Sequence, residues 1–318
     1  MVKKKRNILV MVLVLVLGMS TLAACGNGGG AEDDKLRIGV VLKSLANPFY
    51  VTMAEAIEER AEELGVELLL QATDSEMDAE GQLQIVEDMI VQGVDAILLT
   101  PNGSIELVPA VSRANEAGIP MFIVDTPLDD DAMDSAGAYI HSFVGSDNYY
   151  GGQVAAQELY EALGGSGQVA VLEGISGHES SIDRVEGFSG MVQEMGGLEI
   201  VASQPANWDQ EQGYTVFQNI LQANPGIIGL FAANDMMALG AVQAISDAGM
   251  SDVITVIGFD ATDDAIEAIE RGDMLGSIAQ SPGGMGVIAL ETAFAYLEDD
   301  VSPPAHISVD VFMLSANN

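Results

Sequence analysis

Short apolar runs alternate with helical patterns along almost the whole chain after residue 35, and this alternation constrains the fold more than any other feature. Residues 36–42 (LRIGVVL) are typical of a buried parallel strand. Residues 48–64 then carry apolar side chains on one helical face, and Gly65 provides a helix end. A strand, a helix and a further strand predict right-handed βαβ units and parallel sheets.

A break in this rhythm divides the chain into two series. An acidic segment over residues 129–134 is expected to form a solvated loop, and a second strand–helix series begins after residue 146. A final strand is predicted over residues 308–313. The chain of 318 residues is long enough for two domains. We therefore predict an α/β fold with two doubly wound parallel-sheet lobes.

The N-terminus has the pattern of an export signal. Lys3, Lys4, Lys5 and Arg6 precede an apolar run over residues 8–17, and Leu-Ala-Ala-Cys follows, ending at Cys25. The segment resembles the signal of bacterial lipoproteins, which implies that Cys25 is lipidated and becomes the mature N-terminus. An ordinary export signal with an incidental cysteine is the alternative. Residues 1–24 are then the signal peptide, and residues 25–35 are a flexible tether.

The charge of the chain excludes some partners. The net charge is −37, and only 7 basic residues stand against 48 acidic ones from Cys25 onward, which gives −41. Such a chain is unsuited to binding nucleic acid or an anionic membrane surface through charge. Because Cys25 is the only cysteine, no internal disulfide can form.

Polar and aromatic residues cluster where the predicted strands end. Open α/β sheets bind ligands at the carboxyl ends of their strands. Carboxylates, amides and a guanidinium can each bond vicinal hydroxyls, and aromatic faces cover apolar sugar faces. Each residue could instead cap a helix or pack locally. The candidates are Lys43, Asn47, Phe49, Tyr50, Asp125, Arg184, Trp208, Asn234, Asp260 and Gln280.

Five stretches resemble the sugar-binding proteins of ABC importers, in the ribose and allose branch of the periplasmic binding protein type I family. They are residues 41–50 (VLKSLANPFY), 202–209 (ASQPANWD), 231–240 (FAANDMMALG), 256–260 (VIGFD) and 278–280 (IAQ).

The resemblance implies a role for each candidate. Hydrogen bonds to sugar hydroxyls are implied for Asn47, Asp125, Arg184, Asn234, Asp260 and Gln280. Stacking on the ring is implied for Phe49, Tyr50 and Trp208. Lys43 and Trp208 match the allose-type pattern better than the ribose-type one. Thr126 stands where ribose-type proteins have a second arginine, so an aldohexose, a ketohexose or a polyol all remain open.

The resemblance also implies a hinge with three crossovers between the lobes, which we place near residues 146–147, 280–282 and 305–307. The N-terminal lobe would comprise residues 36–146 and 281–305, and the C-terminal lobe residues 147–280 and 306–318. Sugar would bridge both lobes and select the closed form. The closed protein, expected to be a monomer, would then present its sugar to an ABC permease from an extracytoplasmic, lipid-anchored position.

Other functions have less support in the sequence. No cofactor or metal is expected: His178-Glu179 lacks the second histidine of a zinc helix, and Asp129 to Asp131 lack calcium-loop spacing. No nucleophile motif indicates an enzyme. A transcriptional regulator would need a helix-turn-helix where the export signal stands. A sugar or polyol sensor that reports to a membrane receptor remains an alternative.

Overall fold

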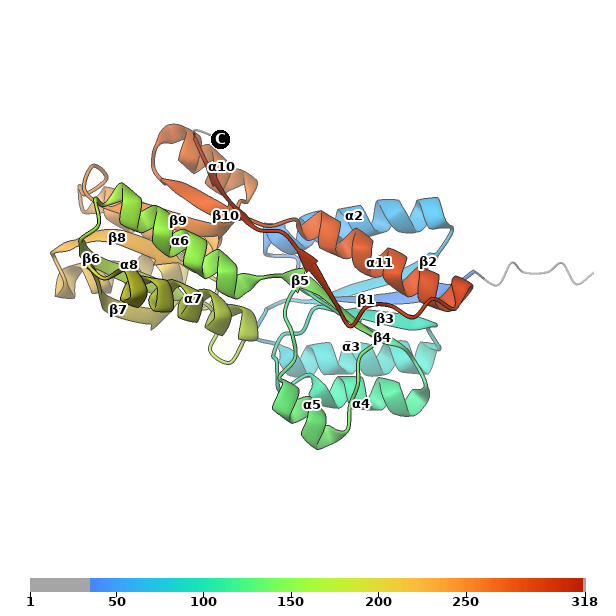
Figure 1. Ribbon diagram of the computed structural model, residues 1–318. Helices are drawn as coiled ribbons and strands as arrows, with labels where there is room; N and C mark the ends of the chain where they lie inside the picture. Colours follow the sequence, from blue (N-terminus) through green and yellow to red (C-terminus); the bar gives the residue numbers. More distant parts are fainter. Residues whose placement is uncertain (1–34, 317–318) are drawn as a thin grey trace, which may run out of the picture. The chain divides into compact units, whose positions relative to one another are not determined.

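The computed structural model describes residues 35–316, and the chain from Leu36 onward forms one compact unit. The predicted signal peptide and Cys25 lie outside the described residues. Two six-stranded sheets organise this unit, each with its own helices (Figure 1). The predicted fold of two α/β lobes with doubly wound sheets is therefore confirmed.

The first sheet has the order β11-β5-β4-β3-β1-β2. All of its pairings are parallel. Its strands are β1 (Arg37–Ser44), β2 (Glu67–Thr73), β3 (Ala96–Leu99), β4 (Met121–Val124), β5 (Ser142–Ser146) and β11 (His306–Val309). Its helices are α2 (Pro48–Leu64), α3 (Ala79–Gln92), α4 (Val108–Ala117), α5 (Asp130–Ala136) and α11 (Pro282–Asp299).

The second sheet repeats this plan with the order β12-β10-β9-β8-β6-β7. Its strands are β6 (Gly167–Glu173), β7 (Leu198–Pro205), β8 (Ile227–Ala232), β9 (Thr255–Asp260), β10 (Gly276–Ala279) and β12 (Phe312–Ser315). Its helices are α6 (Asn148–Ala162), α7 (Glu179–Met195), α8 (Gln210–Ala223), α9 (Asp235–Asp247) and α10 (Asp263–Arg271). In both sheets the strand order reverses beside the first strand of the series, which places a ligand-binding crevice at the carboxyl ends of the strands.

Each sheet is buried on both faces because the strands are apolar on both. In β1, Val40 packs with α2 and α11, whereas Val41 packs with α3 and α4 on the other side. Helix α2 begins where the sequence indicated: the side chain of Asn47 accepts a hydrogen bond from the backbone N–H of Phe49, and Pro48 follows in the first turn. The left-handed Gly65 ends it.

The C-terminal prediction is wrong in two respects. One strand was expected over residues 308–313, but the structure has two: β11 is parallel to β5, and β12 is antiparallel to β10. The third crossover accordingly lies at residues 310–311, not at residues 305–307, and residues 306–309 belong to the first sheet. One apolar pattern runs through both strands, since Ile307 packs on the first core and Leu314 on the second.

The acidic segment is also more ordered than predicted. Residues 130–136 form α5, and the carboxylate of Asp129 accepts from the backbone N–H of Ala132 at 2.6 Å. Asp130 and Asp131 lie in the first turn, where carboxylates interact favourably with the helix dipole. Negative charge at this point therefore starts a helix instead of excluding one.

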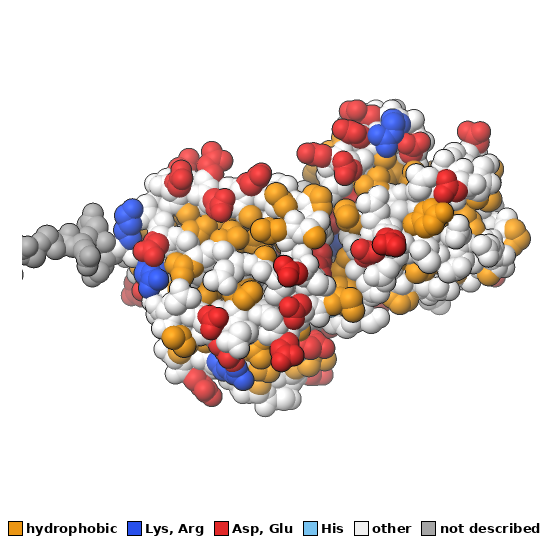
Figure 2. Space-filling model, turned by 180° about the vertical axis from the view of Figure 1, so that it is seen from behind, with side chains coloured by type: hydrophobic (Ala, Val, Ile, Leu, Met, Phe, Trp, Pro, Cys, Tyr) orange, Lys and Arg blue, Asp and Glu red, His pale blue; other side chains and the backbone are white. Residues whose placement is uncertain are grey.

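Elsewhere carboxylates are scattered over the surface, with few basic side chains between them (Figure 2). Within residues 35–316, no helix is long and apolar enough to cross a membrane.

Candidate ligand-binding site

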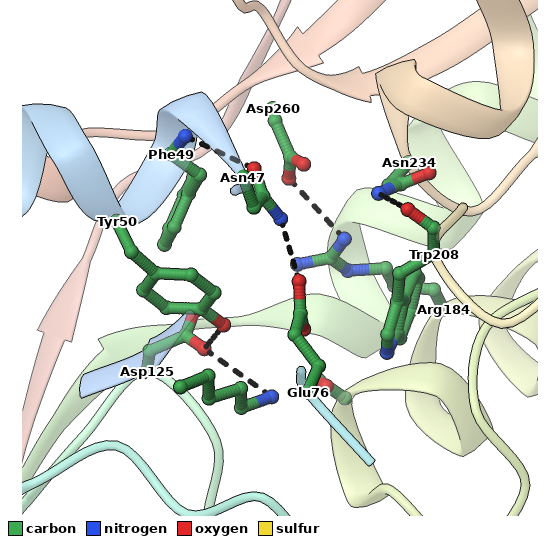
Figure 3. Close-up of a pocket in the computed structure, with 11 residues that line it drawn as sticks. Asn47, Phe49, Tyr50, Glu76, Asp125, Arg184, Trp208, Asn234 and Asp260 are labelled. Carbon is green, nitrogen blue, oxygen red and sulfur yellow. Dashed lines mark hydrogen bonds and ion pairs between the residues drawn. The ribbon is translucent and has the colours of Figure 1, made fainter. Parts of the chain in front are cut away.

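A pocket lies at the carboxyl ends of both sheets and takes side chains from each lobe (Figure 3). Its lining is mostly polar, with three aromatic rings. The lining residues are Lys43, Asn47, Phe49, Tyr50, Glu76, Asp125, Ser180, Arg184, Trp208, Asn234 and Asp260.

In the first lobe, a lysine and an aspartate are joined through hydroxyl groups. Lys43, at the end of β1, donates to Thr126 Oγ1 at 2.8 Å, and its Nζ lies 4.0 Å from Asp125 Oδ2. Asp125 Oδ2 also accepts from Tyr50 at 3.0 Å and from Thr126 at 2.9 Å. The neighbouring Phe49 ring meets the Tyr50 ring edge to face, at 5.1 Å between centroids. All of these side chains are buried.

Burial changes the pKa values of Lys43 and Tyr50. Burial lowers the pKa of Lys43, and the nearby Asp125 opposes that shift. The pKa of Tyr50 lies well above its ordinary value because of burial and the Asp125 carboxylate. Tyr50 therefore remains a neutral hydrogen-bond donor across the physiological range of pH.

A glutamate that sequence reasoning missed closes the first-lobe side. Glu76 lies in the loop after β2, and its Oε1 accepts from Asn47 Nδ2 at 2.9 Å. The same Asn47 caps α2 through its other amide atom. Burial raises the pKa of the Glu76 carboxyl, whereas Lys43 lowers it. Its position just beyond a strand end is the signal that could have identified it.

In the second lobe, a single arginine organises the site. From α7, Arg184 Nε donates to Asn148 Oδ1 at 2.8 Å, and Nη1 donates to the Ala233 carbonyl at 2.7 Å and to Asp260 at 3.3 Å. Its guanidinium carbon lies 3.8 Å from the centroid of Phe259 and 5.5 Å from that of Trp208. The guanidinium is therefore held in one orientation by both planar stacking and hydrogen bonds.

Asp260 sits on a strained turn that a second, deeper aspartate supports. Asp260 and Ala261 have φ values of 114° and 53°. The fully buried Asp235 accepts from Ser277 Oγ at 2.7 Å and from the backbone N–H of Thr262 at 2.8 Å, and Ser277 Oγ accepts from the backbone N–H of Ala261 at 3.0 Å. Burial raises the pKa of both Asp235 and Asp260, and Arg184 opposes the shift at Asp260.

A second left-handed turn places Trp208 in the pocket. Asn207 and Trp208 have φ values of 54° and 62°. The indole packs against Gly174, where an added Cβ would lie 2.0 Å from a ring carbon, so only glycine fits. The carbonyl of Trp208 accepts from Asn234 Nδ2 at 3.4 Å, and Asn234 also caps α9 through Met237. The helix-cap interpretation of Asn234 is therefore correct, and the same residue still lines the pocket.

The structure brings nine of the ten predicted residues into this lining, and Gln280 is the exception. Gln280 lies behind Asp260, to which its Nε2 donates at 2.7 Å, and it lines an adjoining hollow. Thr126, which departs from the ribose-type pattern, is fully buried beneath the pocket and bonds to Lys43. Ser180 is a further lining residue that the sequence did not indicate.

The chemistry of the lining favours hydrogen bonding over covalent reaction. Two cations stand beside three carboxyl groups, and amides and hydroxyls complete the lining. Among residues 35–316 there is no group of three or more histidine, cysteine, aspartate or glutamate side chains suited to a metal ion. A larger hollow of about 600 Å³ beside α5, β5 and β11 contains none of the predicted site residues.

Comparison with known proteins gives a consistent family. The family model described as a periplasmic binding protein domain matches residues 38–300. The D-allose-binding periplasmic protein of Escherichia coli (strain K12) is 37% identical over 253 residues, which cover 79% of this chain and 81% of that protein. The ribose import binding protein RbsB of Bacillus subtilis (strain 168) is 34% identical over 291 residues, or 88% of this chain and 90% of the relative.

Solved structures agree with the sequence comparisons. An ABC transporter periplasmic solute-binding protein from Actinobacillus succinogenes with bound D-allose has a TM-score of 0.85 and 39% identity, covering 89% of this chain and 98% of that one. A solute-binding protein from Bacillus halodurans with bound myo-inositol has a TM-score of 0.83 and 29% identity, covering 91% and 97%. These relatives are binding proteins of transport systems, not enzymes.

Proposed function

This chain belongs to the periplasmic binding protein domain family, and on that premise we propose that it captures a single monosaccharide between its lobes and delivers it to an ABC importer. The observation that carries the proposal is the pocket in which fixed polar groups and aromatic rings from both lobes converge. A polar lining with a few aromatic rings suits a sugar, because the polar groups can bond its hydroxyls and the rings can cover its C–H faces.

The contacts support a division of roles. Asn47, Asp125 and Glu76 from the first lobe and Arg184, Asn234 and Asp260 from the second would bond sugar hydroxyls, since carboxylates, amides and guanidinium accept or donate in pairs. Lys43 would donate from the floor of the pocket, and Phe49, Tyr50 and Trp208 would cover the apolar faces of the ring. Gln280 would act indirectly, by donating a hydrogen bond that orients Asp260.

The charge balance favours a neutral ligand. Each cation has a carboxylate beside it: Lys43 lies 4.0 Å from Asp125, and Arg184 lies 3.3 Å from Asp260. Neither cation is left free to pair with an anionic substrate. D-allose is the first candidate, ahead of ribose and cyclic polyols, for two reasons. Similar proteins are named or solved as D-allose binders, and the lysine at position 43 matches the allose-type pattern.

Closure of the hinge would provide the mechanism. Only the form in which both lobes contact the ligand makes both sets of hydrogen bonds, so the sugar selects that form.

Cys25 would anchor the protein to the membrane on its extracytoplasmic side through a lipid. Mass spectrometry of the protein extracted from membranes should then find Cys25 as the N-terminal residue with acyl chains attached, and an unmodified Cys25 would overturn the anchor.

A thermal-shift screen tests the binding function. The purified protein is heated with D-allose, D-ribose, D-tagatose and myo-inositol in turn. A ligand that binds only the folded state stabilises it by about 2.7 kcal/mol at a hundredfold excess over its Kd. We expect a shift with D-allose that is lost in Asp125→Ala. No shift with any sugar or polyol would overturn the proposed ligand class.

A further inference from the structure

A buried histidine links the two lobes beside the pocket without lining it. His178 is 2% exposed and occupies the N-cap position of α7 in the second lobe, where its side chain makes no capping bond. Its Nε2 lies 2.9 Å from the carbonyl oxygen of Asn102, which belongs to the first lobe. Its Nδ1 lies 3.4 Å from the indole Nε1 of Trp208. One imidazole thus contacts both the opposite lobe and an aromatic residue of the pocket.

These two contacts together require one protonation state. The Asn102 carbonyl can only accept, so Nε2 must carry a proton. The indole N–H of Trp208 can only donate, so Nδ1 must offer its lone pair. The geometry therefore selects the neutral imidazole protonated on Nε2. A second proton on Nδ1 would place two donors face to face.

The first-lobe end of this link is rigidly held. The backbone N–H of Asn102 donates to Gln82 Oε1 at 2.7 Å, and its side-chain amide donates to Thr73 Oγ1 at 2.8 Å. Gln82 and Thr73 are both buried. A second bond between the lobes adjoins it, since the backbone N–H of Glu179 donates to Ser104 Oγ at 3.1 Å. The Asn102 carbonyl is therefore a fixed target that His178 meets only when the lobes are together.

We propose that His178 is a latch that couples the position of Trp208 to closure of the lobes. The inference rests on the proposed function, because the latch matters for binding only if a ligand is held between the lobes. His178 is a positioning residue: its neutral ring orients the indole through Nδ1, and it bonds the first lobe through Nε2 only in the closed form. It thereby slows release of the ligand.

The latch gives binding a defined pH dependence. Burial and the positive charge of Lys43 lower the pKa of His178 to about 3 in the closed form. The segments that contain His178, Asn102 and Trp208 carry further charged groups: Glu179 and Asp183 on α7, Glu106 after β3 and Asp209 after β7. In an open form, with the Asn102 contact broken and solvent around the ring, the pKa of His178 would rise toward its ordinary value of 6.5. Protonation then favours opening, so affinity falls as the pH drops below 6.5.

Three substitutions separate the two contacts. An asparagine amide reaches only the Nδ1 side and can still accept from Trp208, whereas a glutamine amide reaches the Nε2 side and can still donate to Asn102. We expect the dissociation rate of D-allose, measured by stopped flow, to rise about tenfold in His178→Ala and His178→Asn and by no more than about threefold in His178→Gln. Equal rates in all three variants, or wild-type rates in His178→Ala, would overturn the latch.

The pH profile and a sugar-free measurement complete the test. Between pH 7.5 and 5 the wild type should lose affinity about 30-fold more than His178→Gln does, as expected for a pKa near 6.5 in the open form. Trp208 is the only tryptophan of the chain, so its emission reports directly on the ring. Without sugar, its emission should titrate with pH in the wild type and stay flat in His178→Ala. If the Trp208 emission titrates with pH but no sugar binds, only the proposed ligand class is refuted. If the emission does not titrate, the contact between His178 and Trp208 is refuted.

Discussion

The two halves of the pocket hold their buried charges by different means. In the first lobe, Lys43 Nζ and Asp125 Oδ2 are 4.0 Å apart, and the Thr126 hydroxyl forms a hydrogen bond with each of them. In the second lobe, the guanidinium of Arg184 makes three hydrogen bonds and stacks on Phe259. Hydroxyl groups rotate freely and can exchange partners with a sugar, whereas a guanidinium is a planar fork. The first half is therefore adaptable and the second is fixed.

The backbone shows the same contrast. In the second half, four non-glycine residues adopt positive φ, in the turns at residues 207–208 and 260–261. In the first half Asp125 does, with φ 68°, and Asp300, with φ 52°, lies away from the pocket at the end of α11. Such residues cost of order 1–3 kcal/mol each and persist only where the surroundings hold them. The stability of the protein should therefore depend on the contacts of the second half far more than on those of the first.

The largest effect is expected for Arg184→Ala. The substitution leaves the carbonyl of Ala233 and the side chain of Asn148 without their donor, and it removes the cation beside the buried Asp260 carboxyl. Breaking a buried ion pair on one side costs about 3–5 kcal/mol. The free energy of unfolding, measured in urea, should fall by about that amount, and sugar binding should be lost.

Arg271→Ala is the matched control for this prediction. Arg271 is exposed and pairs with Glu267 and Asp273 on the surface. Its removal should change the free energy of unfolding by less than about 1 kcal/mol. If the two variants lose similar amounts of stability, the fixed network around Arg184 does not hold the second half together.

An intermediate effect is expected for Asp235→Asn. The amide keeps one oxygen acceptor but turns an NH₂ group toward Ser277 or Thr262, both of which donate to the wild-type carboxylate. Losing a bond of this kind costs about 1–3 kcal/mol. The turn that carries Asp260 should shift, so that sugar affinity measured by calorimetry falls about tenfold. Asp247→Asn, at the exposed end of the same helix, should change neither quantity appreciably.

The pH dependence of this variant has a definite sign. Burial raises the pKa of Asp235 in the folded state above its ordinary value of 3.8. At pH values between these two pKa values, the folded state therefore binds more protons than the unfolded state. The wild type therefore loses this contribution to stability as the pH rises above 3.8, and the variant does not. The stability difference between the two should narrow from pH 4 to pH 7, as urea unfolding can measure. A difference that widens would contradict a raised pKa.

Much of this arrangement could be predicted from local sequence. The α2 start at Asn47-Pro48 and the left-handed Gly65 are local signals, and the structure has the predicted helix bounds. Asp125 follows a strand of the first sheet, and Asn234 and Asp260 lie at the ends of strands of the second. The strand pattern therefore places all three at the carboxyl ends of the sheets, where the pocket lies. Such features depend only on neighbouring residues and on the parallel topology.

Other features depend on contacts between distant residues. Glu76 lines the pocket, where its carboxylate accepts a hydrogen bond from Asn47. Gln280 lies outside the lining and donates a hydrogen bond to Asp260. Asp235 lies in the first turn of α9, but its role follows from Ser277 and Thr262, which lie 42 and 27 residues away. The two C-terminal strands share one apolar pattern, and only the sheet that each one joins distinguishes them. Local propensity carries no information on such pairings.

The smallest effect on stability is expected for Lys43→Met, which tests the adaptable half directly. Methionine matches the apolar stem of lysine, and Asp125 keeps the Tyr50 and Thr126 hydroxyls as donors. These two donors should offset most of the cost of leaving the buried Asp125 carboxyl without its cation, because the Lys43–Asp125 pair is 4.0 Å apart and has no direct hydrogen bond. The free energy of unfolding should therefore fall by about 1 kcal/mol, well below the about 3–5 kcal/mol expected when the Arg184 pair is broken. Burial lowers the pKa of Lys43 below its ordinary 10.5, so the wild type should gain stability as the pH rises toward 10.5, while the variant should lack this gain. A loss as large as that of Arg184→Ala, measured in the same urea titration, would show that both halves are equally fixed.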